Sequence, residues 1–349
     1  MKTPMPRSQR GAATLAVALM LLAAMLLALV AANRNLLLEL RQSANQSEST
    51  LAFEAAEAGL EWATALLNDS TARGDDCLLA AGGASFRERH LNTASAALTP
   101  RELRPACVFG AEGWACGCPA DTAAFPDTTV ANGAAFALRL EPGPHPGLLR
   151  LSAVGCSRWS GECRPDGSGS DRAVSRHAAV LALQPALASP PAAALTMRPA
   201  AVEPASFFAA HFGVSKAAWL RQPAVRTLDC QGECSAALAA LASEGVTLVA
   251  LPGDLLLRGP LTLGTPQRPM LIVASGTVQL QGAVTLHGVL YGNGIAWSAP
   301  AATVNGALFS EGAAGGDTSL VLTRDADVLD ALRTRQGSFV RLPGSWRDF

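Results

Sequence analysis

The feature that most constrains this chain is an uncharged apolar run near its N-terminus. The run extends from Ala12 to Ala32, close to the roughly 20 residues that an α-helix needs to span a lipid bilayer. Three basic residues precede it, Lys2, Arg7 and Arg10, so the positive-inside tendency places the N-terminus in the cytoplasm and the rest of the chain outside. The sequence therefore predicts a membrane span or an export signal.

The sequence after the apolar run also favours a helix. Gly59 is the only glycine between Ala12 and Asn68, and no proline occurs there, so one helix on the order of 85 Å is predicted. In its second half, apolar residues recur at three- and four-residue steps, which is typical of a helix with one buried face. These residues are Phe53, Ala56, Leu60, Ala63 and Leu67, whereas Glu54, Glu57 and Glu61 lie on another face.

A cleaved signal peptide is the alternative for the first segment. Such peptides have an apolar core of about 7 to 15 residues and a cleavage site of small residues, and Val30-Ala31-Ala32 fits such a site. The mature protein would then start near Asn33. The long helical continuation favours an anchor, because a cleaved peptide needs no such continuation.

The N-terminal region up to Leu60 resembles that of PilX-like minor pilins. The resemblance is carried by Gln9-Arg10-Gly11-Ala12-Ala13, the apolar span and residues 51–60. It implies that residues 1–11 are a prepilin leader, that prepilin peptidase cuts after Gly11, and that the new amine of Ala12 is methylated. Residues 12–32 would be the transmembrane half of the pilin helix. Its membrane-packing positions are expected to be Ala12, Leu15, Ala16, Leu19, Leu22, Leu26 and Leu29.

The fifth residue of the expected mature chain differs from that of major pilins. There it is a glutamate that meets the N-terminal amine of a neighbouring subunit, whereas here it is Ala16. A charge inside a membrane-like helix bundle is costly unless paired, so a subunit without it loses one contact that sets its register. PilX-like proteins often lack this glutamate too, which favours a place at the filament tip or in a priming complex.

Residues 33–184 are predicted to form a pilin-like head of α+β class. Residues 70–130 mix glycine, proline, aspartate and threonine, which predicts a long irregular connection. Three strand-like runs follow, 134–140, 148–155 and 173–183, and indicate an antiparallel meander. A small sheet of this kind needs the long helix packed on it to be stable.

The cysteines are expected to be oxidised, because the chain carries an export or anchor segment. Cys156 and Cys163 are close enough in sequence to pair at the tip of the meander, and Cys230 and Cys234 are close enough for a local bridge. Two further bridges are expected among the remaining four cysteines, with the pairing left open. These four are Cys77, Cys107, Cys116 and Cys118.

A separate second domain is predicted after a linker. Residues 185–205 are rich in proline and alanine, which favours an extended semi-rigid spacer. Residues 206–349 are predicted to be β-rich and repetitive, with short helices near 217–220 and 235–241. Glycines between positions 276 and 312 follow a six-residue frame, which is typical of a parallel β-helix with about 18 residues per coil.

Two residues after each frame position lies a residue that is expected to face the interior of the coil. Fewer than three coils fit into the repeat, so an irregular β-roll is the alternative. This region also resembles the C-terminal part of longer PilX-like proteins, through Gly253-Asp254-Leu255, residues 269–294, residues 304–307 and the ending at residues 343–349. The inward column consists of Val278, Val284, Leu290, Ala296, Ala302 and Leu308.

No residue constellation indicates catalysis. The histidines are far apart and fall in different predicted elements. Asp254 and Asp317 could be an acidic pair of a polysaccharide-cleaving β-helix, and His287 could be the base of an acyltransferase, but turn and surface positions are the simpler interpretations. Cys116 and Cys118 could bind a metal, but no CxxC pair or nearby histidine supports this. We therefore expect no enzymatic activity, cofactor or metal.

The resemblance implies a minor pilin that takes part in type IV pilus assembly, in a priming or tip complex. A charged fraction of 16% and a net charge of -1 provide no basic field for nucleic acid. Expected partners are other minor pilins, the major pilin, prepilin peptidase and a surface adhesin. We expect an inner-membrane protein with periplasmic C-terminal domains that later reaches the pilus or cell surface. Alternatives are a tip adhesin module, favoured if Trp297 and Trp346 are exposed, and the tip pseudopilin of a type II secretion system.

Overall fold

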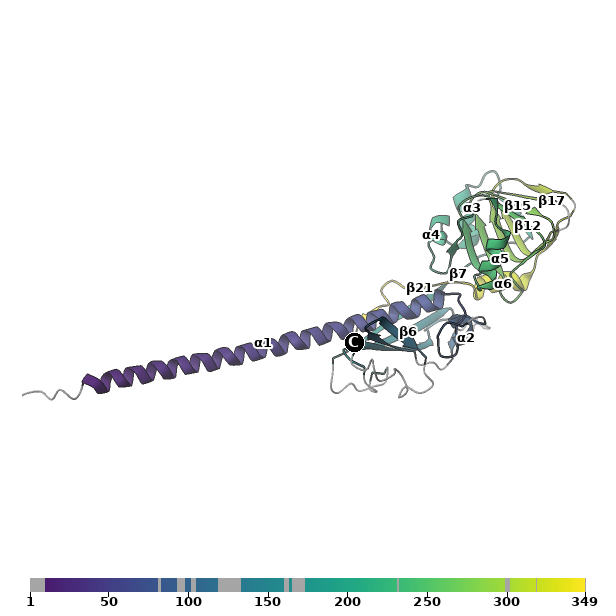
Figure 1. Ribbon diagram of the computed structural model, residues 1–349. Helices are drawn as coiled ribbons and strands as arrows, with labels where there is room; N and C mark the ends of the chain where they lie inside the picture. The colour runs from purple at the N-terminus through teal and green to yellow at the C-terminus, as the bar shows by residue number, and fades with distance from the viewer. Residues whose placement is uncertain are drawn as a thin grey trace, which may run out of the picture.

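The computed structural model describes residues 10–80, 83–92, 98–101, 105–118, 133–159, 163–164, 173–230, 232–298, 302–317 and 319–348. Residues 1–9 of the expected leader lie outside this range, and only the helical backbone is described for Arg10, Gly11 and Ala12. A long helix leads into a small α+β head, and a β-solenoid lies beyond the head (Figure 1).

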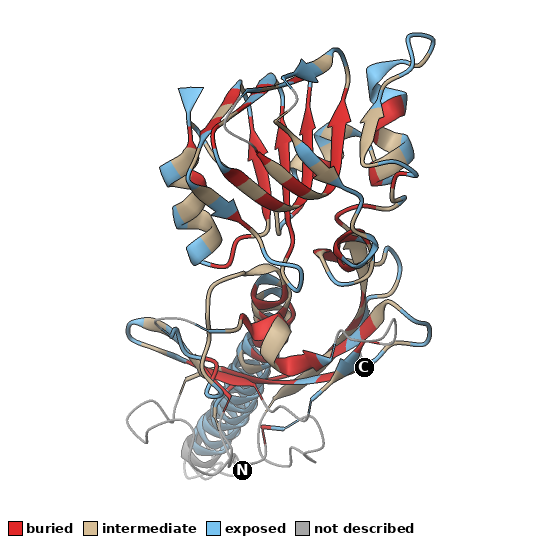
Figure 2. Cartoon of the chain, turned by 90° about the vertical axis from the view of Figure 1, so that its right-hand side faces the viewer, coloured by how far each residue is buried: buried red, intermediate tan, exposed pale blue. Residues whose placement is uncertain are grey.

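Helix α1 (Arg10–Asn68) is continuous over 59 residues, about 88 Å at 1.5 Å per residue. This confirms the uninterrupted helix that the sequence predicts. Every residue from 13 to 47 is exposed, whereas the C-terminal part of the helix lies in the head (Figures 1 and 2). We call residues 13–47 the free half of α1 and residues 52–68 the packed half.

The head is built on an antiparallel sheet that carries the packed half of α1. Its meander consists of β5 (Ala135–Pro142), β6 (Leu148–Cys156) and β7 (Val174–Pro185), as the sequence predicts. Ala56 and Leu60 of α1 are buried against these strands, together with Phe136 and Leu151. Phe53, the first residue of the predicted stripe, is 41% exposed. The buried face of the helix therefore begins at its neighbour Ala52.

The prediction that residues 70–130 form an irregular connection is wrong for part of this segment. It contains a hairpin, β3 (Ala106–Gly110) and β4 (Gly113–Gly117), which extends the sheet beside β5. It also contains α2 (Phe86–His90), which begins with a capping box formed by Ser85 and Glu88. Two short strands follow α2, β1 (Leu91–Asn92) and β2 (Thr99–Pro100).

The second domain is a parallel β-solenoid with two sheets around an apolar interior. The first sheet has the order β10-β12-β15-β17-β19, and every neighbouring pair is parallel. Its strands are β10 (Gly232–Glu233), β12 (Leu255–Arg258), β15 (Thr277–Gln281), β17 (Gly294–Ser298) and β19 (Ala314–Gly316).

The second sheet has the order β20-β18-β16-β14-β11-β9, and β13 and β8 pair with β16 and β18. All of these pairs are parallel too. The parallel β-helix prediction is therefore confirmed. The strands are β8 (Leu195–Met197), β9 (Arg226–Thr227), β11 (Leu248–Leu251), β13 (Leu261–Leu263), β14 (Met270–Ala274), β16 (Val284–Gly292), β18 (Thr303–Ser310) and β20 (Val321–Thr323).

The coils have the expected length where the glycine frame is regular. Met270 pairs with Gly288, and Gly288 pairs with Gly306, which matches coils of about 18 residues. The solenoid begins before the repeat, because Leu248 already pairs with Leu271 across a longer coil. The glycine frame thus marks only the later coils.

The predicted inward column is correct except at Ala296. Val278, Val284, Leu290, Ala302 and Leu308 are buried in the interior, but Ala296 is exposed. The cause is a coil that is one residue short, since Val278 pairs with Ile295 and not with its neighbour Ala296. Because side chains alternate along a strand, this shift places Ile295 in the interior and turns Ala296 outward.

The outer face of the second sheet is covered by helices. Aromatic side chains of α3 (Pro204–Phe212) and α4 (Lys216–Leu220) are buried there against Tyr291 and Phe309, and α6 (Ala326–Thr334) adds Leu329. Helix α5 (Ser235–Ser243) contributes Leu238 to the interior. The expected helices near 217–220 and 235–241 are thus present.

The segment predicted as a spacer, residues 185–205, is part of the solenoid. Ala186 and Leu187 are buried beside the helices, and β8 pairs with β18. The prediction of an extended linker is wrong, because the start of the segment is buried in the fold and residues 195–197 pair as a strand.

The chain ends in the head and not in the solenoid. Strand β21 (Gly337–Arg341) and strand β22 (Arg347–Asp348) both pair with β7, antiparallel. The C-terminus accordingly lies beside α1 in Figure 1. The expected division at residue 206 therefore misses that the solenoid is inserted between two neighbouring strands of the head sheet. We call residues 337–348 the return segment.

Candidate functional site

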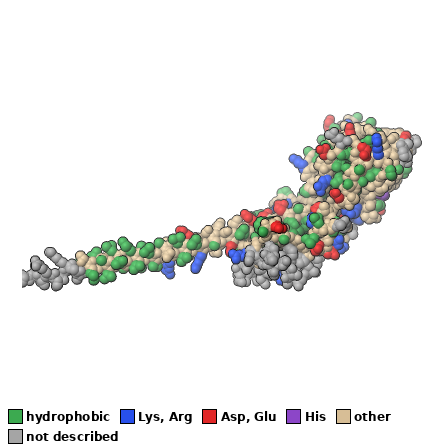
Figure 3. Space-filling view, in the orientation of Figure 1, with side chains coloured by type: hydrophobic (Ala, Val, Ile, Leu, Met, Phe, Trp, Pro, Cys, Tyr) green, Lys and Arg blue, Asp and Glu red, His purple; other side chains and the backbone are tan. Residues whose placement is uncertain are grey.

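Within the described part of the chain, no other helix or strand buries the free half of α1, which is mostly apolar from Ala13 to Ala32. Leucine side chains at the predicted packing positions 15, 19, 22, 26 and 29 are 57–66% exposed, and apolar side chains cover most of the visible surface (Figure 3). In the described part of the chain, α1 is the only helix long and apolar enough to cross a membrane. Since no described helix or strand covers it, lipid or other chains can bury its apolar part.

The exposed apolar surface extends beyond the predicted span. Leu36, Leu37, Leu38 and Leu40 are each more than half exposed, although they follow Arg34. The uncharged run does not include these residues, because it ends before the first charged residue. Their clustering as three consecutive leucines could have revealed them.

The packed half of α1 meets the sheet at a glycine. A Cβ at Gly155 would lie 2.0 Å from the Ala52 carbonyl oxygen and 2.3 Å from the Ala56 backbone nitrogen. Only a residue without a side chain allows this approach. This contact fixes the level at which the head sits on the helix.

The return segment is held against α1 by polar side chains. Trp346 Nε1 donates to Glu57 Oε1 at 2.6 Å, and the buried His177 places its Nδ1 2.7 Å from the same oxygen. Arg341 lies 3.1 Å from Glu61. Two of the three glutamates that the sequence assigned to the other face of the helix, Glu57 and Glu61, thus bind the end of the chain.

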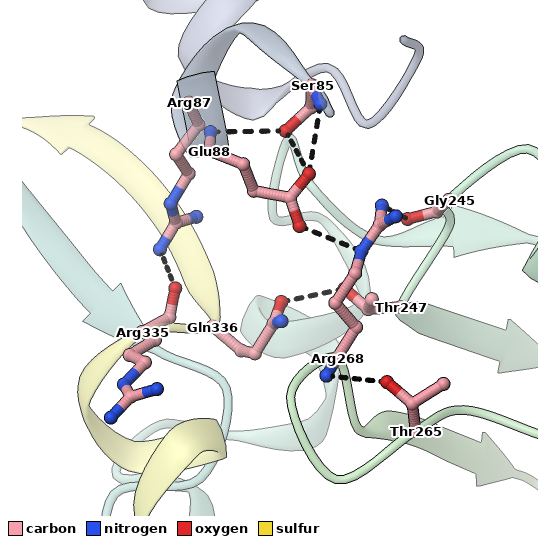
Figure 4. Close-up of polar contacts among 9 residues, drawn as sticks. All are labelled: Ser85, Arg87, Glu88, Gly245, Thr247, Thr265, Arg268, Arg335 and Gln336. Carbon is pink, nitrogen blue, oxygen red and sulfur yellow. Dashed lines mark hydrogen bonds and ion pairs between the residues drawn. The ribbon is translucent and has the colours of Figure 1, made fainter. Parts of the chain in front are cut away.

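A polar junction joins the head to the solenoid (Figure 4). Arg268 of the solenoid lies 2.8 Å from Glu88 of α2, and Thr247 donates to Gln336 at 2.8 Å. Arg87 donates to the carbonyls of Arg335 and Gly337. Burial lowers the pKa of the Arg87 guanidinium to about 10, so the group stays charged at neutral pH.

A cavity of about 140 Å³ lies at this junction. Asn68, Asp69, Arg268 and Gln336 are among the residues that line it. Partial burial acts to raise the pKa of Asp69, but hydrogen bonds from Thr71 and Arg73 outweigh it and hold the pKa below its ordinary value. Asp69 is therefore engaged within the head, whereas Arg268 and Gln336 make the contacts between the head and the solenoid.

All eight cysteines are paired. Cys156 bonds to Cys163 and Cys230 to Cys234, as their spacing predicts. The pairing that the sequence left open is Cys77 with Cys118 and Cys107 with Cys116. Among the described residues, no group of three or more histidine, cysteine or acidic side chains could hold a metal ion.

The residues considered for catalysis are not brought together. Asp254 Oδ1 accepts a hydrogen bond from the Thr277 backbone at 2.7 Å, and Asp317 Oδ1 accepts one from the Ser319 backbone at 2.9 Å. Both carboxylates therefore act as turn residues. His287 lies on β16 and pairs with Asn305 on β18.

The tryptophans considered as adhesive residues both have intramolecular partners. Trp297 Nε1 donates to the Asp317 carbonyl at 2.7 Å. Trp346 is 41% exposed, but its Nε1 donates to Glu57.

Comparison with known proteins identifies one segment. The PilX N-terminal family model matches residues 10–61, which are most of α1. No curated protein and no solved structure matches the chain. This segment begins a long helix whose first half is exposed, and the match supports a PilX-like type IV pilin.

Proposed function

We propose that this chain is a non-enzymatic minor pilin that takes part in type IV pilus assembly, in a priming or tip complex. The observation that carries the proposal is the free half of α1, which is exposed on all sides and is mostly apolar from Ala13 to Ala32. Such a surface is stable in a bilayer before assembly and among other apolar helices afterwards. The PilX match over residues 10–61 supports the same function.

The proposed orientation follows from the charges around the span. The leader stays in the cytoplasm, residues 12–32 cross the inner membrane, and the head and solenoid lie in the periplasm. The partners are prepilin peptidase, other minor pilins and the major pilin, whose helices cover the free half of α1. Assembly then carries the head and solenoid to the pilus.

Two observations favour a priming or tip position over the body of the filament. Position 16 is alanine, so the contact that a glutamate makes in major pilins is missing. The solenoid lies at the end of the molecule opposite the apolar helix (Figure 1). A domain of this size beyond the head is most easily accommodated where few subunits follow.

Intact mass and N-terminal peptide mapping of the protein from native membranes test the proposal. We expect a mature chain that starts at Ala12 with a methylated amine. A start near Asn33, or an unprocessed Met1, contradicts the proposed pilin function. Substitution Gly11→Leu should leave the leader attached, while Gly59→Ala, far from the cleavage site, should not affect processing.

A further inference from the structure

Two pairs of charged residues on α1 have the same spacing. Arg34 is followed by Arg41 at the same interval as Glu54 is followed by Glu61. All four are exposed. No ion pair within the described part of the chain involves Arg34, Arg41 or Glu54, and the Glu61 side chain remains 71% exposed beside Arg341.

Helix geometry places each pair on one face of α1. The interval within a pair is almost two turns, so its members lie on the same face about 10 Å apart along the axis. The offset from the first pair to the second corresponds to about 30 Å along the axis and about 200° around it. The basic face and the acidic face are therefore on opposite sides of the helix.

We propose that α1 binds a second copy of this chain in parallel, shifted along the axis so that Arg34 of one copy faces Glu54 of the other. Arg41 of the first copy then faces Glu61 of the second. We call this arrangement the Arg34–Glu54 register. Of all shifts between parallel copies of the described helix, only this one places both arginines opposite glutamates. The charge complementarity thus selects one register.

Apolar residues independently fit the Arg34–Glu54 register. Ala16 lies five full turns before Arg34, and Leu36 lies five full turns before Glu54, so each is on the same face as its charged residue. The shift brings Ala16 of one copy opposite Leu36 of the other, and Met20 opposite Leu40. Met20, Leu36 and Leu40 are 75%, 56% and 61% exposed.

This register accounts for two features of the chain. It covers the leucines that lie beyond the predicted membrane span with the span of the second copy. It also makes alanine suitable at position 16, because a glutamate there would face Leu36. The contact rests on the proposed function, because the membrane span of one copy can lie beside the leucines of the other only after the first copy has left the bilayer.

The opposite placement of the two faces determines the kind of assembly. Each copy can offer its basic face to one neighbour and its acidic face to another. Contacts of this heterologous kind do not close on themselves when they include a translation, so a pair of copies keeps one basic and one acidic face free for neighbouring pilins. The charges set register and specificity, and the apolar side chains supply the buried area.

Disulfide cross-linking in piliated cells tests the register. One tagged chain carries Asn45→Cys and a second chain carries Ala65→Cys, both exposed positions that the Arg34–Glu54 register brings together. We expect a cross-linked pair in several-fold higher yield than with a control in which the first chain carries Thr50→Cys in place of Asn45→Cys. Position 50 is also exposed, but in this register it lies about 7.5 Å further along the axis and on another face of the helix. Peptide mapping of the four native disulfides checks that the cross-linked protein is correctly folded.

Charge reversal separates a specific register from chance proximity. Arg34→Glu with Arg41→Glu in the first chain should lower the yield several-fold, and Glu54→Arg with Glu61→Arg in the second should restore it. Equal yields with the Thr50→Cys control, a yield unaffected by reversal, or failure of the restoration would overturn the proposal. A link from position 45 only to another membrane protein would overturn it as well.

The same sample distinguishes this proposal from the proposed function. If the N-terminus is a methylated Ala12 and no cross-link forms between positions 45 and 65, only the pairing of two copies is wrong. If the N-terminus is unprocessed, the pilin function itself is contradicted.

Discussion

Gly155 shows how one residue determines whether the head can sit on its helix. Replacement by alanine would bring a Cβ within 2.3 Å of two backbone atoms of α1, at Ala52 and Ala56. Backbone on both sides cannot move without separating helix and sheet, so Gly155→Ala should lower the free energy of unfolding of the head by about 3 kcal/mol. Urea unfolding of the detergent-solubilised chain measures this loss. Gly253→Ala, where no atom lies within 4 Å of the added Cβ, should change it little.

Asp69 makes the stability of the head depend on pH in the acid range. Hydrogen bonds from Thr71 and Arg73 hold its pKa below the ordinary value in the folded chain, so the unfolded chain binds this proton more readily. The contribution of the Asp69 carboxylate to stability is complete above the ordinary pKa of about 4. It is lost as the pH falls through the lowered pKa of the folded chain.

The effect of Asp69→Asn should therefore depend on pH. At pH 6 the substitution should cost less than about 1 kcal/mol, because the group is partly exposed, and near pH 3 the difference from the native chain should shrink. Urea unfolding at both pH values measures it. Asp330→Asn, at an exposed carboxylate paired with Arg333, serves as the control. A cost that is the same at both pH values would contradict this assignment.

At the residue scale, the sequence predicts which residues are exposed and which neighbouring cysteines pair. It predicts contacts between residues far apart in the chain much less well. The leucines of the free half and the bridges at Cys156 and Cys230 follow from local spacing. The contact of Glu57 with Trp346 does not, because the two residues are 289 positions apart. Local pattern carries no information about such a pair.

At the scale of elements, periodicity and length predict α1 and the meander, but short strands escape. The hairpin of β3 and β4 has five residues in each strand, which is too few for a clear alternation, and its glycines resemble those of a loop. The one-residue shift in strand pairing at Ile295 cannot be recognised in the sequence either, because the glycine frame stays regular through this coil.

One side chain at the C-terminal end of α1 makes two hydrogen bonds to the backbone of β21. Asn68 Nδ2 donates to the Phe339 carbonyl at 2.9 Å, and the Phe339 backbone nitrogen donates to Asn68 Oδ1 at 2.8 Å. The amide side chain therefore reproduces the hydrogen bonds of a neighbouring strand. Without it, two backbone groups of β21 lose their partner.

Asn68→Ala should cost about 2 kcal/mol of stability and should increase hydrogen exchange at the Phe339 amide. Asn68→Asp keeps an oxygen that accepts from this amide, so its exchange should rise less. If both variants exchange at the same rate as the native chain, the helix does not hold the strand in this way. Exchange at Leu290, inside the solenoid, should be the same in all three proteins.

At the scale of the whole molecule, the insertion of the solenoid into the head sheet was beyond the sequence pattern. Strand β7 ends at Pro185 and its neighbour β21 begins at Gly337, so the entire solenoid separates two paired strands. From the sequence alone, a glycine-rich region near the end of a chain is interpreted as a separate domain that follows the head. The return of the last residues can be recognised only when the sheet has been assembled.

Because the chain crosses between head and solenoid twice, the junction should hold the two domains in one orientation. The side-chain contacts across it, Arg268 with Glu88 and Thr247 with Gln336, are partly exposed, and each contributes about 1 kcal/mol or less to stability. Their removal should therefore affect orientation more than folding. The variant Arg268→Met with Thr247→Val tests this expectation.

Electron–electron distance measurements between bio-orthogonal spin labels at Trp114 in the head and Thr277 in the solenoid report the orientation. The native chain should give a narrow distribution, and the double variant a distribution at least twice as broad with urea unfolding nearly unchanged. Arg333→Met removes an exposed ion pair within α6 and should leave the distribution narrow. An equally narrow distribution in the double variant would mean that the two chain crossings, together with the hydrogen bonds of Arg87 to the second crossing, are enough to fix the solenoid.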